Sequence, residues 1–181
     1  MQKCAMVKRP YAPGLHGKKG SRLSEYGLQL AQKQKIKKTY GVLEKQFKKY
    51  FSKAVKQGGD TRQNLLTRLE TRLDNVIFRA GLASSRAAAR QLVGHKHILI
   101  SGKTVNIPSY WVKVGQTITL KDNIKKSKLF ENLTTNLKNY QSPGWLALDK
   151  EKMEVKIISQ PTVDDLGNLS KIGLIVEFYS R

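Results

Sequence analysis

The chain has 181 residues, with 34 Lys or Arg against 13 Asp or Glu, so its formal charge is +21. An enzyme acting on a neutral metabolite has no need of such a charge, which repels itself. The single cysteine, Cys4, excludes a disulfide-stapled domain, and no uncharged apolar run approaches the roughly 18–20 residues that span a bilayer. Apolar residues make up 39% of the chain, which is enough for a core in one or two domains.

The positive charge is concentrated in the first two thirds of the chain. Residues 1–60 carry 15 basic and 3 acidic side chains, residues 61–125 carry 11 and 3, and residues 126–181 carry 8 and 7. A basic patch of this size indicates nucleic-acid binding with release of counterions. The alternatives are a solvated basic surface and a basic helix on a membrane, and two separate basic segments favour nucleic acid over both.

The first 23 residues predict an extended basic arm. Pro10, Pro13 and Gly14 prevent a helix over this stretch, and few apolar side chains are available for burial. We therefore expect residues 1–23 to become ordered only on a partner.

Residues 24–60 are expected to be helical. Ser24 is the expected N-cap, Gly41 either divides the region into two helices or kinks it, and Gly58 with Gly59 ends it. Apolar side chains recur every three or four residues, which predicts one buried stripe. The members of this stripe are Ile36, Tyr40, Leu43, Phe47, Tyr50 and Ala54.

Two further helices are expected before the first strand. Thr61 would cap a helix that Gly81 closes, and Ser84 or Ser85 would cap a short helix over 86–93 that Gly94 stops. The expected buried face of the first of these helices consists of Leu65, Leu66, Leu69, Leu73, Val76, Ile77 and Ala80.

After Gly94 the apolar period changes from 3.6 to 2, which predicts strands. Alternation over 98–107 around a turn at Ser101 and Gly102 predicts a hairpin, and a second short strand pair is expected within 112–120. Further along, the pattern predicts a helix over 129–137, a turn at Pro143, and strands at 155–158 and 174–179.

No arrangement of residues suited to catalysis or metal binding is found in the sequence. Gly14 and Gly17 are too close together for a phosphate-binding loop, and one cysteine with three histidines does not supply a tetrahedral zinc site. Asp74 stands among basic residues, so we expect it to form an internal salt bridge with Arg72 or Arg79 rather than to act as a catalytic acid. We expect no enzymatic activity, no cofactor and no metal.

The stretch 72–120 is the most informative part of the sequence. Arg86 and Arg90 stand beside the N-terminus of a short Ala-rich helix, where free backbone N–H groups favour a phosphate. Polar residues extend this face toward the hairpin turn, which suits an RNA duplex or junction recognised by its shape and phosphates. The alternative is a small α/β core with an incidental basic face.

Several segments resemble the family of bacterial small-subunit ribosomal protein number four. In the central stretch these are RLDNV at 72–76, ASSRAAARQLV at 83–93 and GKTVNIPSY at 102–110. The flanking segments are RPYAPGLHG at 9–17, LSEYGLQL at 23–30, YGVLEKQF at 40–47 and LIVEFYSR at 174–181. The resemblance therefore covers essentially the whole chain. Pseudouridine synthases and some tRNA synthetases carry a similar central module, but they add a catalytic domain for which no room remains.

The resemblance implies an α+β fold, with a helical domain and an inserted α/β RNA-binding module of two helices plus antiparallel hairpins. The implied division is a basic arm at 1–23, a helical domain at 24–61 plus about 166–181, and an inserted domain at 62–165 with the module at about 72–120. The family binds small-subunit rRNA at a multi-helix junction, nucleates assembly of the subunit body and contributes to translational accuracy. Implied neighbours are ribosomal protein number five and messenger RNA near the entry channel, with no membrane.

The resemblance also implies which side chains contact RNA. In the arm they are Arg9, Tyr11, His16, Lys18, Lys19 and Arg22; in the first helical region they are Tyr26, Lys33, Lys37, Lys38, Gln46 and Lys49. In the central module they are Arg72, Ser85, Arg86, Arg90, Gln91, His95 and Lys103.

Family members usually begin some thirty residues earlier, often with a cysteine-rich segment that binds zinc or an iron–sulfur cluster. Cys4 aligns with the last of those cysteines, and without its partners we expect no metal. The alternatives to a ribosomal role are an RNA-binding regulator outside the ribosome and an RNA-modifying enzyme of the pseudouridine synthase type. The resemblance places the protein in the cytoplasmic ribosome, with an organellar ribosome as the alternative.

Overall fold

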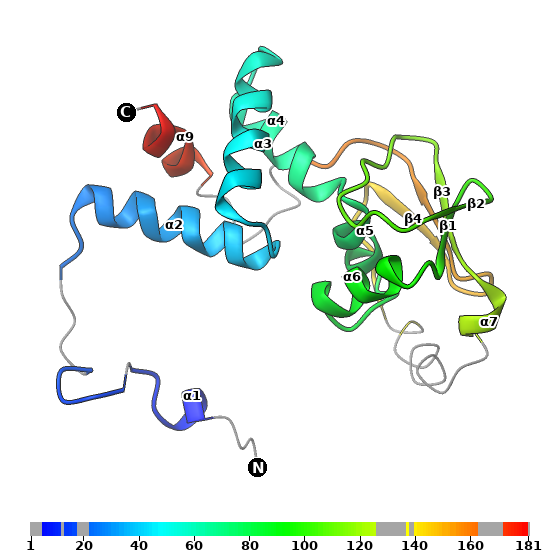
Figure 1. Cartoon of the computed structure of the whole chain (residues 1–181), viewed down its shortest axis with the longest axis horizontal. Helices are drawn as coiled ribbons and strands as arrows, with labels where there is room; N and C mark the ends of the chain where they lie inside the picture. Colours follow the sequence, from blue (N-terminus) through cyan, green and yellow to red (C-terminus); the bar gives the residue numbers. More distant parts are fainter. Residues whose placement is uncertain are drawn as a thin grey trace.

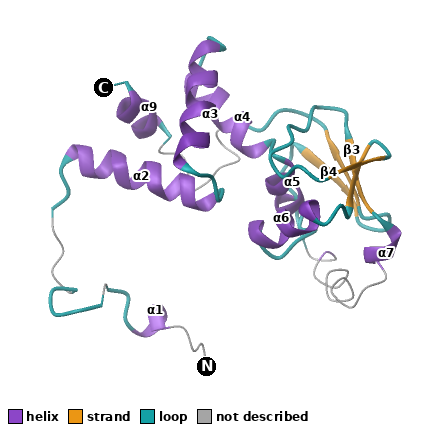
Figure 2. Cartoon of the chain, in the orientation of Figure 1, coloured by secondary structure: helices purple, strands orange, loops and turns teal. Residues whose placement is uncertain are grey.

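The computed structural model describes residues 5–11, 13–17, 22–125, 137, 140–162 and 172–180. Figure 1 shows two groups of elements: α2, α3, α4 and α9 on one side, and a β-sheet with α5 and α6 on the other. Figure 2 shows that all the strands lie in the second group. Helices and an antiparallel sheet together make an α+β fold, as the sequence predicted.

The arm is less extended than expected, because α1 (Ala5–Lys8) forms one helical turn within it. No side chain of α1 is buried, and Figure 1 shows the arm running apart from the other helices. The turn ends at Lys8, two residues before Pro10, because a proline disfavours a helical conformation in the residue that precedes it.

Two helices, α2 (Glu25–Thr39) and α3 (Glu44–Lys56), form the first helical region. The Oγ of Ser24 accepts the Gly27 N–H at 3.2 Å, which confirms the predicted cap. Gly41 divides the region with φ 60°, a left-handed conformation that glycine adopts without strain. The break rotates Leu43 out of the predicted stripe, and its side chain is 80% exposed.

The leucine-rich stretch that follows forms two helices, where the sequence predicted one. They are α4 (Thr61–Glu70), which Asp60 caps in place of Thr61, and α5 (Leu73–Arg79). Arg72 between them is extended and pairs with Trp111 as an isolated β-bridge. All seven predicted apolar positions are buried, but in two different cores: Leu65, Leu66 and Leu69 of α4 pack in one, and the four positions of α5 and its C-cap pack in the other.

The sheet is antiparallel throughout, in the order β2-β1-β3-β5-β4. Its strands are β1 (Ile98–Ile100), β2 (Lys103–Val105), β3 (Thr117–Leu120), β4 (Leu146–Asp149) and β5 (Glu154–Ile157). Ser101 at φ 46° and Gly102 at φ 82° form the predicted hairpin turn between β1 and β2. The expected strand pair at 112–120 is wrong: only β3 forms there, between β1 and β5.

Two short helices flank the sheet. One is α6 (Arg86–Gly94), whose cap is Ser85, and the other is α7 (Asp122–Lys125), which the sequence did not predict. Strand β4 was not predicted either, whereas β5 was. The helix expected over 129–137 falls outside the described residues except for Leu137, which is buried in the core.

The predicted strand at 174–179 is a helix, α9 (Gly173–Tyr179). Its apolar residues Ile172, Ile175, Val176 and Tyr179 have helical spacing and pack into the same core as Ile36 and Phe47. A continuous apolar run cannot distinguish a buried strand from a buried helix, and tertiary packing decides between them here.

Two hydrophobic cores result. One lies among α2, α3, α4 and α9, and the other lies between α5, α6 and the sheet. Leu65, Leu66 and Leu69 of α4 belong to the helical core, although the resemblance had placed 62–70 in the inserted domain. We therefore propose a helical domain of α2 to α4 with α9, interrupted by an inserted domain that begins at α5.

Candidate nucleic-acid interface

A buried carboxylate connects the two cores. Glu70 is 1% exposed, and its side chain accepts hydrogen bonds from Tyr40, from Asn75 Nδ2 at 2.6 Å and from Arg79 Nη2 at 2.7 Å. Burial, together with the charge of Glu70, raises the pKa of Tyr40 well above its usual value. Tyr40 therefore remains a neutral donor, and one carboxylate ties the end of α2 to α5.

Arg72 was expected to contact RNA but is 3% exposed. Its Nε donates to Asp74 Oδ1 at 3.0 Å, and its Nη1 donates to the Tyr50 hydroxyl at 2.7 Å. The predicted internal salt bridge of Asp74 is present, and it belongs to Arg72. This arginine therefore joins α3 to α5 inside the protein and has little surface to offer a partner.

Arg86 is also directed inward. Its Nε donates to Asn75 Oδ1 at 2.8 Å, and its guanidinium lies 4.4 Å from the ring centre of Phe78 and 5.0 Å from that of Tyr40. Burial lowers the pKa of Arg86, and the two aromatic faces stabilise its charge. The first arginine of α6 thus braces the junction of the two cores.

The outer face of α6 remains open to a partner. Ser85 Oγ accepts the Ala88 N–H at 3.1 Å, and the Arg90 side chain is 56% exposed, 3.8 Å from Asp74 Oδ2. Gln91, His95 and Lys103 are exposed. The face is polar and basic, as the sequence predicted, but its exposed arginine is Arg90 and not Arg86.

On α2 the predicted contacts divide in the same way. Lys33 is 6% exposed, and its Nζ lies 2.9 Å from Glu44 Oε1 and 4.4 Å from the Phe178 ring centre. Lys37 Nζ lies 3.0 Å from Glu44 Oε2. Lys38, in contrast, is exposed to solvent. Lys33 and Lys37 thus stabilise the fold, and Lys38 is accessible.

The charge of Glu44 is held by several donors. Burial by itself would raise the pKa of Glu44, but hydrogen bonds from Lys33, Lys37 and Tyr179 outweigh it and lower the pKa to about 2. Tyr26 packs against Phe178 of α9, with 5.5 Å between ring centres and the rings tilted by 33°, and remains 50% exposed.

The outer face of α3 carries a row of lysines, which we call the lysine face. These side chains are separated mostly by three or four residues, with one adjacent pair at 48 and 49, and they surround one shallow depression together with Ser52. They are Lys45, Lys48, Lys49, Lys53 and Lys56. The sequence assigned only Lys49 to RNA, although the helical spacing of the other four could have indicated them.

A groove runs beside the lysine face, between α3 and α4 and the segment 107–114. It consists of three hollows of about 280, 180 and 490 Å³. The first two share Gln46 and Ser109, and the last two share Arg68 and Trp111. Lys53 belongs to both the groove and the lysine face, so the two surfaces are continuous. None of the described residues that line them is Asp or Glu.

Comparison with known proteins identifies the family. Residues 1–70 match the ribosomal protein S4/S9 N-terminal domain, and residues 71–118 match the S4 domain. Small ribosomal subunit protein uS4 of Halothermothrix orenii is 50% identical over 99% of this chain and 86% of that protein. Small ribosomal subunit protein uS4A of Alkaliphilus oremlandii is 52% identical over the same shares of the two chains. The chain belongs to the uS4 family.

The uS4 family consists of structural ribosomal proteins, so the expectation of a protein without enzymatic activity is confirmed. Within the described residues, no group of three His, Cys, Asp or Glu side chains is placed to hold a metal. No helix of the described residues has the length and apolar character needed to cross a membrane.

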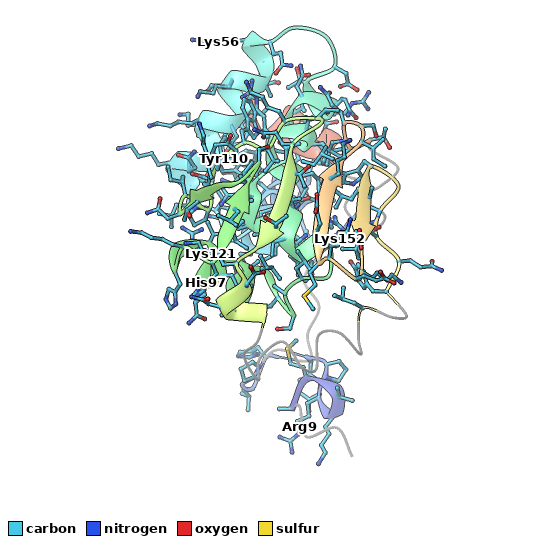
Figure 3. All side chains as sticks on the ribbon, turned by 90° about the vertical axis from the view of Figure 1, so that its right-hand side faces the viewer. Arg9, Lys56, His97, Tyr110, Lys121 and Lys152 are labelled. Atoms are coloured by element: carbon cyan, nitrogen blue, oxygen red, sulfur yellow. The ribbon has the colours of Figure 1, made fainter. Side chains whose placement is uncertain are left out.

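The arm of this uS4 chain exposes Arg9, Tyr11, His16 and Arg22, whereas Lys18 and Lys19 lie outside the described residues. Figure 3 shows Arg9 and Lys56 at opposite ends of the molecule, with Lys121 and Lys152 between them. Sequence reasoning missed Arg68 and Trp111, because neither position carries a local pattern and the groove forms only when distant segments meet.

Proposed function

We propose that this chain is a structural constituent of the small ribosomal subunit and binds small-subunit rRNA directly at a junction of several helices. The observation that carries the proposal is the lysine face and its continuous groove, lined by no carboxylate among the described residues. A concave basic surface suits phosphates that converge from more than one RNA helix, because each neutralised phosphate releases counterions.

In this role the protein does no chemistry. It lowers the repulsion between RNA helices that meet at the junction and so nucleates assembly of the subunit body. The exposed face of α6, whose Arg90 lines one hollow of the groove, and the arm add further phosphate contacts. As part of the same proposal, the chain contacts ribosomal protein number five and messenger RNA near the entry channel, contributes to translational accuracy, and resides in cytoplasmic ribosomes.

The proposal is tested by measuring binding to a transcript of the small-subunit rRNA junction and to an unrelated folded RNA over a salt series. Both affinities should fall with salt, since each phosphate contact adds about −0.7 to −0.9 to the log–log slope. A preference for the junction that persists at high salt supports recognition of its shape. Equal binding of the two RNAs at every salt concentration would contradict it.

A regulator outside the ribosome would bind RNA as well, so the location of the protein is measured separately. Tagged protein in a cell extract is separated on a sucrose gradient. The proposal expects it to sediment with small subunits and their precursors, whereas a regulator would remain in the light fractions.

A further inference from the structure

Arg68 and Trp111 form a stacked pair at the point where two hollows of the groove meet. The Arg68 guanidinium carbon lies 4.2 Å from the Trp111 ring centre, and Arg68 Nη2 donates to Gln57 Oε1 at 2.9 Å. Arg68 Nε is buried without a hydrogen-bond partner, and no described carboxylate forms an ion pair with this side chain. Burial lowers the pKa of Arg68, and no ion pair with a described carboxylate offsets this effect.

The backbone holds Trp111 in place. The Val112 N–H donates to the Thr71 carbonyl at 3.0 Å, the Leu73 N–H donates to the Tyr110 carbonyl at 2.9 Å, and Trp111 pairs with Arg72 as a β-bridge. Even so, 43% of the Trp111 surface is exposed. A large aromatic ring fixed at the edge of a basic groove is preorganised for a flat ligand, because little freedom is lost on binding.

The surroundings of the pair match the parts of a nucleotide. The hollow of about 490 Å³, the largest of the three in the groove, is lined by Arg68, Trp111 and Lys113 together with the polar residues Thr67 and Asn64. Aromatic rings stack on bases of any identity, and a guanidinium binds phosphate with paired N–H groups. Continuity with the lysine face through Lys53 favours a nucleotide within an RNA chain over a free one.

We propose that Trp111 stacks on an unpaired base of the bound RNA while Arg68 binds an adjacent phosphate. This inference rests on the proposed function, because it assigns one nucleotide of the same RNA to the groove. Arg68 covers part of one side of the indole ring and fixes its orientation, and the exposed part of the ring receives the base.

Trp111 can report on the contact itself. The chain has two tryptophans, and Trp145 is 3% exposed. In the full-length Trp145→Phe protein the emission comes from Trp111 alone. Titration with the rRNA junction transcript should quench this emission in step with binding measured by anisotropy of labelled RNA. Inorganic polyphosphate, which carries phosphates without bases, should bind the lysine face and leave the emission largely unchanged.

Matched variants separate stacking from charge. Trp111→Ala should weaken junction binding by roughly five- to 150-fold, which is the range for loss of one stacked base. The slope of log affinity against log salt concentration, called the salt slope, should not change. Trp111→Phe, which retains an aromatic ring, should keep most of the affinity, and Arg68→Gln should reduce the salt slope by about 0.7–0.9. Ile158→Ala removes another exposed apolar side chain, 56% exposed and outside the groove lining, and should change neither quantity.

The outcomes distinguish this inference from the function on which it rests. Binding of the junction with unchanged Trp111 emission, or with full affinity in Trp111→Ala, would overturn the stacking and leave RNA binding standing. Equal quenching by polyphosphate and RNA would also overturn it, since no base would then be needed. Failure of the unaltered protein to bind the junction would overturn both proposals together.

Discussion

Arg72 and Asp74 form a buried ion pair in which two nitrogens of the guanidinium donate to the two carboxylate oxygens, with 3.0 Å between Nε and Oδ1. The two residues are 3% and 4% exposed. The pair lies where the helical core meets the inserted part, and Tyr50 of α3 receives a third hydrogen bond from Arg72. A basic residue in a basic sequence thus serves the fold rather than a partner.

Replacing Asp74 by Asn should destabilise the protein, because the Arg72 charge would remain buried without a carboxylate. Loss of one partner of a buried pair costs about 3–5 kcal/mol of unfolding free energy. Urea unfolding of Asp74→Asn, Arg72→Gln and the double variant measures how much the contribution of each side chain to the free energy of unfolding depends on the other. Fully additive losses would show that the two side chains do not depend on each other.

The exposed pair of Asp60 and Arg62 provides the matched control. Their side chains are 48% and 60% exposed, and Asp60 also caps α4. Asp60→Asn keeps a good capping residue and removes only the charge, so its effect on unfolding should be small. If Asp60→Asn lowered the free energy of unfolding as much as Asp74→Asn does, burial would not be the reason why the Arg72–Asp74 pair matters for stability.

Gly81 should not tolerate a side chain. Its φ is +79°, and a Cβ placed there would lie 2.8 Å from Tyr140 Cδ1. The left-handed conformation alone costs an L-residue about 1–2 kcal/mol, and the contact with Tyr140 adds to it. Thermal unfolding of Gly81→Ala should therefore begin at a lower temperature.

Gly94 at the end of α6 is the opposite case. No atom lies within 4 Å of a Cβ placed there. Gly94→Ala should raise stability by about 0.5–1 kcal/mol, because alanine loses less backbone entropy in a helix. If both glycine variants shifted the midpoint in the same direction, the conformational argument at Gly81 would be wrong.

Stability should fall in acid through Glu44. Its pKa is lowered from 4.5 to about 2 in the folded protein, so the carboxylate contributes stability above pH 4.5 and loses it progressively as the pH falls toward 2. Between pH 4.5 and pH 2, the free energy of unfolding should fall more steeply for the natural chain than for Glu44→Gln. Parallel pH profiles of the two proteins would contradict the role of Lys33, Lys37 and Tyr179 as its donors.

The sequence predicted local structure well where local signals decide it. Ser24 and Ser85 are caps as expected, and the Ser101–Gly102 turn forms the hairpin, because each depends on a few neighbouring residues. The helix α9 was mistaken for a strand because its partners, α2 and α3, lie far away in the sequence. Tertiary packing rather than residue preference determines that segment.

The candidate site shows the same limit. The sequence does not distinguish a lysine or arginine that faces solvent from one that faces an internal partner. Lys33, Arg72 and Arg86 were therefore assigned to RNA, although each is held by internal partners. The groove could not be foreseen, because Arg68 and Trp111 meet only after α4 and the segment 107–114 come together. Lys49 and Arg90 were assigned from the resemblance and remain exposed.

The division of basic residues into an internal set and an RNA-facing set is the central claim, and salt-dependent binding tests it most directly. Affinity for the small-subunit rRNA junction is measured from low to high salt for the natural chain, Lys48→Gln/Lys49→Gln and Lys33→Gln. Two lost phosphate contacts should reduce the log–log slope of the lysine-face variant by about 1.4–1.8. Lys33→Gln, which loses its contact with Glu44, should lower unfolding stability and keep the natural slope. An unchanged slope in the lysine-face variant, or a reduced slope in folded Lys33→Gln, would contradict the claim.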